Sequence, residues 1–267
     1  MCGVVGVFNS EEAAFDTMLG LFAIQNRGQE SCGLAVSNGN QIKLTRGLGL
    51  VKDNFTEKKL RNYPGKMAIG HVRYPTRGTC DVNNSQPHVI ETLEGTIFAL
   101  ASNGDITNYK TLTDELKKKK MNFNSGNDGE LILRHIVWDH IIKEKSIVDS
   151  IKIVMETFKG AFSTVLMGRN EMWAFRDPYG VRPFSFGKTE KGYAFSSESK
   201  GLDILRATEI EEVKPGEIIH VYGDNQIERI NLNSPELRNG RKGCAHCVFE
   251  PVYFSMPDSN QYGLSVY

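Results

Sequence analysis

The chain has 267 residues, which is long enough for one large α/β domain with a complete hydrophobic core, or for one domain and part of a second. Its 32 Lys and Arg balance its 32 Asp and Glu, so no net field attracts it to nucleic acid or to an anionic membrane. No apolar run reaches about eighteen residues, and no basic segment precedes an apolar one at the start, so neither a membrane span nor a signal peptide is indicated. We therefore expect a cytoplasmic protein with no nucleic-acid or membrane partner.

The cysteines also indicate a reducing compartment. Their number, five, is odd, and they are spread unevenly along a large chain, unlike the disulfide framework of a small secreted domain. We expect free thiols at all of them: Cys2, Cys32, Cys80, Cys244 and Cys247.

Strand and helix signals both occur in the first hundred residues. Residues 2–8 form a Val-rich apolar run that predicts a buried strand beginning at the second residue. Residues 11–25 carry apolar side chains at helical spacing, Phe15 and Phe22 among them, and predict a helix with Ser10 as its N-cap and this face toward the core. Short strands are then expected at residues 33–36, 42–45, 67–72 and 96–101.

The pattern changes in the middle of the chain. Residues 109–158 contain three helical stretches, of which 129–142 is the most regular. Strands are expected to resume at residues 161–167, 171–176, 184–187, 193–196, 217–222 and 226–231. Two blocks of strands around a block of helices predict an α+β fold of packed sheets covered by helices, and not a regular βαβ alternation.

A polar stretch near the end predicts a domain boundary. Residues 233–243 are mostly polar and contain Pro235, which is typical of a connector. We therefore expect one domain over residues 1–235 and a connector with the start of a second domain over 236–267, because about thirty residues cannot bury a core alone.

A cysteine directly after the initiator Met offers a complete catalytic unit. Removal of Met1 would leave Cys2 with both a nucleophilic thiol and a free α-amino group. The reference pKa of the amine is about 7.7 to 8.0 and that of the thiol about 8.5, so the amine can take the thiol proton and return it to a leaving group. With Met1 in place the base would be a peptide nitrogen, and the mechanism would stop. The simpler alternative is that Cys2 is a small buried residue at the start of a strand.

Attack on an amide also needs donors for the oxyanion and groups that hold the substrate. Asn103-Gly104, after the apolar run 97–101, offers a side-chain amide and a main-chain N–H, although Asn-Gly is also a leading hairpin-turn signal. Arg73 follows a buried strand and can grip a carboxylate with two donors. Asp128, just before a helix, can hold an ammonium group, and its alternative role is that of a helix N-cap.

Five motifs in order resemble those of the class II glutamine amidotransferases. They are Cys2-Gly3-Val4-Val5-Gly6, Asn26-Arg27-Gly28-Gln29-Glu30, Gly70-His71-Val72-Arg73-Tyr74-Pro75-Thr76, Ser102-Asn103-Gly104 and Asp128-Gly129-Glu130. Within this class, four further segments are similar to the amidophosphoribosyltransferase family: Gln86-Pro87-His88, residues 176–183, Ser197-Glu198-Ser199 and residues 249–259. The resemblance covers nearly the whole chain and implies the N-terminal-nucleophile hydrolase fold, a four-layer αββα sandwich.

The resemblance also implies a site and an activity. Cys2 would be the nucleophile and the base, with Asn103 and Gly104 as the oxyanion hole. The residues expected to bind the glutamine backbone, or to belong to the loop that closes over it, are Arg73, Thr76, Asp128, Arg27 and Gly28. The implied activity is hydrolysis of the glutamine side-chain amide through a Cys2 thioester, giving glutamate, and ammonia for phosphoribosylamine formation in purine synthesis.

The partners implied are glutamine and a phosphoribosyltransferase domain or subunit, of which residues 236–267 would be the beginning; a homo-oligomer is also left open. Two alternatives remain at this point. Instead of the implied domain, the chain could be a stand-alone glutaminase subunit that serves a different ammonia-accepting synthase, or a docking or regulatory module with weak catalysis.

Two further cysteines raise the question of a metal. Cys244 and Cys247 form a C-x-x-C pair, which is half of a zinc site or one edge of an iron–sulfur site. Without a second thiolate cluster we expect no metal or cofactor in this chain, and an iron–sulfur cluster or Mg only in a full-length family member. A rival mechanism uses a papain-like Cys–His pair, for which the candidates are Cys32, Cys80, His71 and His88.

Overall fold

The protein is described by a computed structural model that covers residues 1–75, 80–93, 95–232 and 244–267. A first antiparallel sheet consists of β1 (Gly3–Phe8), β2 (Ser31–Ser37), β3 (Ile42–Leu48), β4 (Met67–Arg73), β9 (Ser185–Lys188), β10 (Tyr193–Ser196) and β11 (Thr208–Glu212). Its strand order is β11-β9-β10-β1-β4-β2-β3. The N-terminal strand therefore lies at the centre of the sheet.

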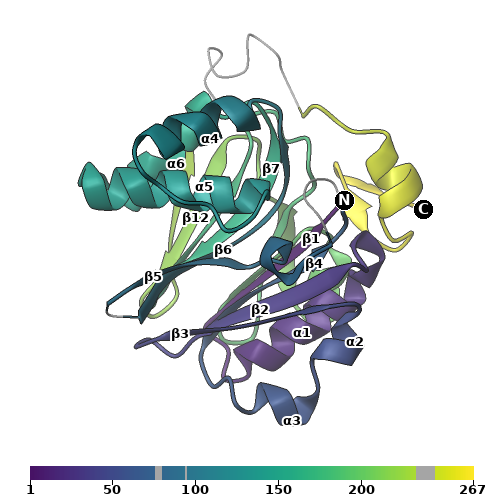
Figure 1. The fold of residues 1–267 in the computed structure, drawn as a ribbon. Helices are drawn as coiled ribbons and strands as arrows, with labels where there is room; N and C mark the ends of the chain where they lie inside the picture. The colour runs from purple at the N-terminus through teal and green to yellow at the C-terminus, as the bar shows by residue number, and fades with distance from the viewer. Residues whose placement is uncertain (76–79, 94, 233–243) are drawn as a thin grey trace.

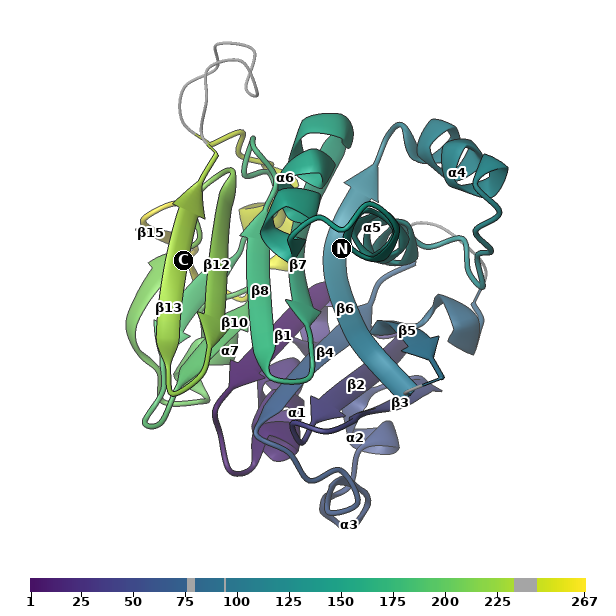
Figure 2. The same cartoon turned by 90° about the vertical axis from the view of Figure 1, so that its left-hand side faces the viewer.

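A second antiparallel sheet lies face to face with the first (Figure 1). Its strands are β5 (His88–Thr92), β6 (Gly95–Ile106), β7 (Gly160–Met167), β8 (Glu171–Arg176), β12 (Glu217–Tyr222) and β13 (Gln226–Asn231). They follow the order β13-β12-β8-β7-β6-β5. The long strand β6 runs past the start of β1, as Figure 2 shows from the side.

Helices cover the outer face of each sheet (Figures 1 and 2). The first sheet carries α1 (Ala13–Ala23), α2 (Val51–Asn54), α3 (Glu57–Leu60) and α7 (Lys200–Asp203). The second sheet carries α4 (Tyr109–Lys118), α5 (Asp128–Val137) and α6 (Ile147–Thr157), with a π-helical turn, η3 (Trp138–Ile142), after α5. None of the helices in the described part of the chain has the length and apolar character needed to cross a membrane.

The two-residue repeat of β1 explains why its sequence is an unbroken apolar run. Val5 and Val7 point to the core beneath α1, while Val4 and Phe8 point to the core between the sheets. A Cβ at Gly6 would lie 3.2 Å from side-chain atoms of the second sheet, so glycine permits close packing there. Three apolar layers separate four structural layers, and the predicted α+β, four-layer αββα fold is confirmed.

Two details of the predicted first helix are wrong. Glu12, and not Ser10, is the N-cap residue, and the Ser10 hydroxyl accepts the Glu12 N–H at 3.1 Å. Phe22 is 57% exposed, because the helix turns its small residues toward the sheet. A Cβ at Gly20 would lie 3.0 Å from Val5. The helix can therefore lie closer to the sheet with Gly20 facing it than it could with Phe22 there.

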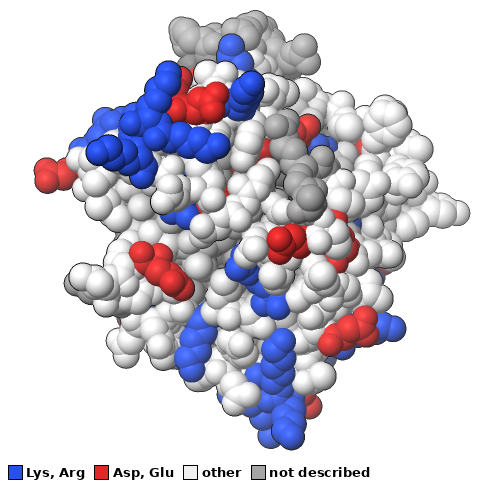
Figure 3. Space-filling view, viewed as in Figure 1, with Lys and Arg blue, Asp and Glu red and all other residues white. Residues whose placement is uncertain are grey.

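Two edge-region strands, β5 and β11, have no counterpart in the sequence predictions. Both are five residues long and carry charged or polar side chains, so neither shows an apolar run. By contrast, the three helices predicted within 109–158 are confirmed. The lysines after residue 116 are exposed at the end of α4, in the helical layer over which Figure 3 shows basic side chains gathered.

Residues 244–267, called here the C-terminal segment, pack against the body of the domain (Figure 1), where the Ala245 N–H donates to the carbonyl of Tyr179 and Glu250 pairs with Arg27. They contain a π-helical turn, η4 (Glu250–Phe254), and the two short strands β14 (Asn260–Gln261) and β15 (Leu264–Ser265). The expected boundary near residue 235 lies outside the described residues. The division into 1–235 and 236–267 therefore stays a prediction.

Candidate active site

Cys2 lies at the entrance of β1, at the centre of the first sheet. The register of β1 with β4 pairs Gly3 with Val72, so Cys2 stands one step further, level with Arg73. Its thiol donates to the carbonyl of Tyr74 at 3.6 Å. Burial raises the pKa of the Cys2 thiol, against the lowering effect of the Arg73 and Arg182 guanidinium groups. The thiol is therefore protonated at rest and needs a base.

The surroundings of the α-amino group of Met1 show how such a base would be protonated. Met1 is buried, and burial lowers the pKa of its α-amino group to about 5, with Arg27 and Arg182 acting in the same direction. An amine in these surroundings is neutral near pH 7, which is the state that can accept a proton. Removal of Met1 would place the α-amino group of Cys2 one residue deeper in the same surroundings.

Arg73 ends β4 with its side chain 1% exposed and forms an ion pair with Glu30. The neighbouring loop can approach only because it contains Gly28. A Cβ at Gly28 would lie 2.4 Å from the main-chain carbon of Arg73. Thus Gly28 and Arg73 are in direct contact beside Cys2, while Thr76, the third residue predicted on this side, lies outside the described residues.

A histidine joins the two sheets next to Cys2. His71 lies opposite Val4 in the first sheet, and its Nε2 lies 3.2 Å from the carbonyl of Ser102 in the second. Since a carbonyl only accepts, Nε2 carries the proton, and burial lowers the pKa of His71 to about 3. This bond brings the residue before Asn103 to the start of β1.

Asn103 and Gly104 lie inside strand β6, opposite Ser163 and Phe162 of β7. The alternative of a hairpin turn at Asn-Gly is therefore wrong. Asn103 is 1% exposed, and its side-chain Nδ2 is a buried donor with no hydrogen-bond partner in the described part of the chain. A buried donor without a partner is costly unless something is meant to bind it.

Asp128 is the first residue of α5, and it lies next to the end of β6. Its Oδ2 accepts the main-chain N–H of Ile106 at 2.9 Å. The N-cap is Asn127, whose side chain accepts the N–H of Gly129 at 2.8 Å, so the alternative role proposed for Asp128 belongs to its neighbour. The helix thus carries the Asp128 carboxylate to the strand that holds Asn103.

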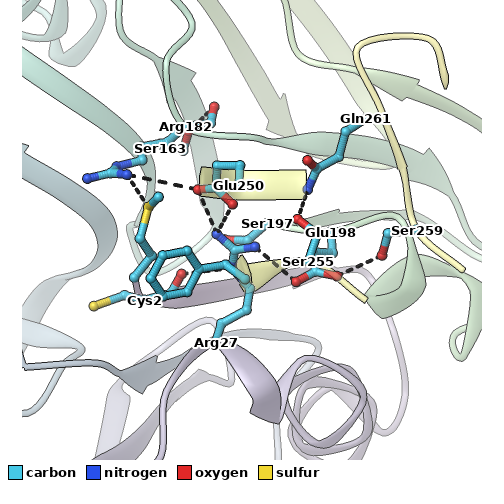
Figure 4. Close-up of polar contacts among 12 residues, drawn as sticks. Cys2, Arg27, Ser163, Arg182, Ser197, Glu198, Glu250, Ser255, Ser259 and Gln261 are labelled. Carbon is cyan, nitrogen blue, oxygen red and sulfur yellow. Dashed lines mark hydrogen bonds and ion pairs between the residues drawn. The ribbon is translucent and has the colours of Figure 1, made fainter. Parts of the chain in front are cut away.

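Arg27 occupies a charged cluster behind Cys2 (Figure 4). Its Nε donates to the carbonyl of Cys2 at 3.0 Å, and its two terminal nitrogens pair with Glu198 and Glu250 at 2.9 Å. All three charged side chains are 0% exposed. Arg27 therefore holds the main chain of Cys2, and a direct contact with substrate stays a prediction.

The two acids of this cluster connect Cys2 to the C-terminal segment. Glu250 belongs to that segment, and Glu198 accepts hydrogen bonds from Ser259 at 2.7 Å and from the Met256 N–H at 2.9 Å. Sequence reasoning gave neither acid a role, although both lie in segments that resemble the family. Apart from that resemblance, the sequence shows only that Glu198 lies next to Ser and Glu250 next to Phe, and neither neighbour predicts a role.

The rival Cys–His mechanism has no geometric support among the described residues. Cys32 is buried in β2, where burial raises its pKa to about 12, and Cys80 is exposed in a loop. Among the hydrogen bonds of the described residues, none joins either thiol to a histidine; His71 contacts Ser102 instead.

The described residues contain no group of three or more His, Cys, Asp and Glu side chains that could hold a metal ion. Among the residues that the structure describes, Cys244 and Cys247 therefore belong to no such group, and zinc or an iron–sulfur cluster needs more than two ligands. The expectation of a metal-free chain stays a prediction.

Comparison with known proteins defines the class. A family model described as a glutamine amidotransferase domain matches residues 77–203. The whole chain is 37% identical to an amidophosphoribosyltransferase of Methanocaldococcus jannaschii and 40% identical to amidophosphoribosyltransferase 3, chloroplastic, of Arabidopsis thaliana, and it covers 58% and 48% of these relatives. The structure of glutamine phosphoribosylpyrophosphate amidotransferase from B. subtilis matches 99% of this chain with a TM-score of 0.87 and 32% identity.

The fold is that of the N-terminal-nucleophile hydrolases, and residues 77–203 match the glutamine amidotransferase domain. Within that class, the whole chain is similar to part of the amidophosphoribosyltransferases that it matches. The chain spans about half the length of the relatives that it matches.

Proposed function

We propose that this chain hydrolyses the side-chain amide of glutamine to glutamate and ammonia, with Cys2 as nucleophile after removal of Met1. The observation that carries the proposal is the position of Asn103 Nδ2, a buried donor with no partner among the described residues, on the strand that His71 ties to the start of β1. A pre-placed donor in a water-poor site is what a developing oxyanion requires.

The chemistry then follows from the two groups on Cys2. The neutral α-amine accepts the thiol proton, and the thiolate attacks the amide carbon of glutamine. The oxyanion binds the Asn103 side chain and the Gly104 N–H, and the C–N bond breaks as the ammonium returns the proton to the leaving ammonia. Water, deprotonated by the amine, attacks the thioester; glutamate leaves, and the thiol recovers its proton.

Recognition of glutamine needs one cation and one anion. Arg73 suits the α-carboxylate, because it is nearly buried and lies level with Cys2. Asp128 suits the α-ammonium, because it is nearly buried at the end of the strand that carries Asn103. Thr76 and the loop with Arg27 and Gly28 complete the proposed set. In this arrangement Arg27 acts by holding the Cys2 carbonyl.

We further propose that the ammonia goes to a phosphoribosyltransferase domain or subunit, for phosphoribosylamine formation in purine synthesis. The similarity to amidophosphoribosyltransferases supports this acceptor. The exposed apolar surface of the C-terminal segment supports it too, since Val248, Phe249, Val252 and Tyr253 are each more than 60% exposed. A cytoplasmic location is part of the same proposal, although several plant relatives are named chloroplastic.

Intact mass and glutamate release test the proposal together. Loss of the Met1 mass, one adduct of a glutamine-directed electrophile on Cys2, and parallel loss of glutamate release are expected; Cys2→Ala should give neither adduct nor glutamate. Cys32→Ala is the matched control and should keep both. A processed protein that binds glutamine but releases no glutamate would instead indicate a docking module.

A further inference from the structure

We propose that Gln86 is a positioning residue for this site: its single buried carboxamide fixes the oxyanion-hole strand and the helix that carries Asp128 at the same time. The inference rests on the proposed function and deepens it. It assigns a mechanical role to the Gln86-Pro87-His88 segment, which none of the steps above uses.

The carboxamide makes three hydrogen bonds. Its Oε1 accepts the main-chain N–H of Ser102 at 2.7 Å, and its Nε2 donates to the Ser102 carbonyl at 3.1 Å and to Asn127 Oδ1 at 3.1 Å. Gln86 is 2% exposed, so water does not compete for these groups. Since an amide has two N–H donors and one carbonyl, all its hydrogens are used.

On the oxyanion side, the side chain replaces a missing strand partner. The register of β5 with β6 pairs His88 with Leu100, and its continuation would place residue 86 opposite Ser102. The Gln86 carboxamide makes there both bonds that a main-chain pair makes in an antiparallel ladder. The peptide that precedes Asn103 is thus held on this edge although β5 begins two residues later.

On the substrate side, the same group reaches the start of α5. Asn127 Oδ1 accepts from Gln86 and from the N–H of Gly129, so Gln86 supports the N-cap of the helix whose first residue is Asp128. Asp128 in turn accepts the Ile106 N–H at the end of β6. Gln86 thus binds both β6, through Ser102, and the N-cap of α5, through Asn127. Asp128 connects α5 back to β6.

Gln86 is itself fixed by its surroundings. A Cβ at Gly33 would lie 2.1 Å from the Gln86 carbonyl oxygen, so the segment passes directly over β2. Arg46 donates to the carbonyl of Ser85 at 2.9 Å and anchors the preceding residue. The main chain of Gln86 is therefore fixed to the first sheet, while its carboxamide binds the second sheet. This arrangement can set the distance between Cys2 in the first sheet and Asn103 in the second.

Gln86→Met keeps the volume of the side chain and removes all three bonds. Because a misplacement of about 1 Å can lower a rate about 100-fold, we expect kcat to fall about 10-fold to 100-fold and KM to rise, the first through Asn103 and the second through Asp128. The buried Gln261→Met, which loses one bond to Ser255, is the matched control and should keep both constants. Wild-type kcat and KM in Gln86→Met would overturn the proposal.

Asn127 offers a second variant. Asn127→Asp keeps the Oδ1 acceptor and should retain most of the activity, whereas Asn127→Leu should resemble Gln86→Met in KM. Gln86 and Asn127 act through the one hydrogen bond that joins them, so the effects of Gln86→Met and Asn127→Leu on KM should be less than additive in the double variant. Additive effects would overturn the coupling.

Amide hydrogen exchange separates this inference from the proposed function. In Gln86→Met, the N–H groups of Ser102 and Gly129 should lose protection together, whether or not the protein hydrolyses glutamine. Unchanged exchange at both would reject the role of Gln86 even in an active enzyme. An inactive wild type with the expected exchange would reject the proposed function alone.

Discussion

Two polar networks hold the two strands of the proposed site, β1 and β6, and they differ in charge. On one side of Cys2, one guanidinium and two carboxylates, all buried, hold the Cys2 carbonyl through Arg27. Across the site, the neutral carboxamides of Gln86 and Asn127 hold the strand of Asn103. The first network pairs its charges with each other, whereas the second leaves the Asn103 donor without a partner among the described residues.

This difference separates stability from catalysis. A paired charge cluster keeps its parts in place, because any loose member would be an uncompensated buried charge. The neutral carboxamides of Gln86 and Asn127 add no permanent charge next to the proposed oxyanion. They hold the strand from which the Asn103 side chain can donate to it. We therefore expect variants on the two sides to fail in different ways.

The largest effect on folding is expected for Glu250→Ala. It leaves one side of the Arg27 guanidinium unpaired at a fully buried position, which costs about 3–5 kcal/mol. Denaturant unfolding should show this loss. Asp149→Asn, which breaks the half-exposed pair with Lys152, is the control and should have little effect. Equal stability of the two variants would contradict the distinction drawn between the networks.

The largest effect on chemistry is expected for Asn103→Ala. Loss of one oxyanion donor lowers kcat by about 100-fold to 1,000-fold. Since Nδ2 has no partner among the described residues, the free energy of unfolding should change little. Steady-state kinetics and denaturant unfolding of the same sample measure both. A large loss of stability with an unchanged kcat would mean that Asn103 belongs to the scaffold.

A smaller effect is expected in the pH dependence of kcat/KM. The amine must be neutral to act as base, and burial lowers the pKa of the Met1 amine to about 5. In the same surroundings the Cys2 amine should keep activity below the usual amine pKa of about 7.7–8.0, with loss only as the pH falls further. Arg182→Gln removes a nearby cation and should move this acid limb to higher pH. An acid limb near 8 in the wild type would show that burial does not tune the amine.

The smallest effect is expected from His71 on stability at low pH. Its pKa is about 3 in the folded protein and about 6.5 in an unfolded chain, so below about 6.5 the unfolded state binds the additional proton. The contribution is complete above that pH and is lost as the pH falls toward 3. The stability of His71→Asn should therefore fall less steeply between pH 6 and about 4 than that of the wild type. Identical slopes would show that His71 is not buried in its neutral form.

Much of this fold was predictable from local sequence. Unbroken apolar runs gave the central strands, and helical spacing gave α4, α5 and α6. The edge strands β5 and β11 were missed because their exposed faces carry polar residues. Phe22 was assigned to the core because spacing shows a face but not how closely small residues such as Gly20 let it pack.

The site divides in the same way. Cys2 and Asn103 could be proposed as site residues from the sequence, because their chemistry is visible in one or two residues. Glu198, Glu250 and Gln86 were not given roles, since each acts through a partner at least sixteen residues away that only folding brings close. Long-range pairing of ordinary polar residues leaves no local pattern.

The most direct test of the account is a single-turnover experiment with glutamine, quenched in acid and analysed by intact mass. The account predicts a transient glutamyl thioester on Cys2 of the processed chain, formed much more slowly in Asn103→Ala and absent in Cys2→Ala. Glutamate release without any adduct on Cys2, or undiminished release from Cys2→Ala, would contradict it.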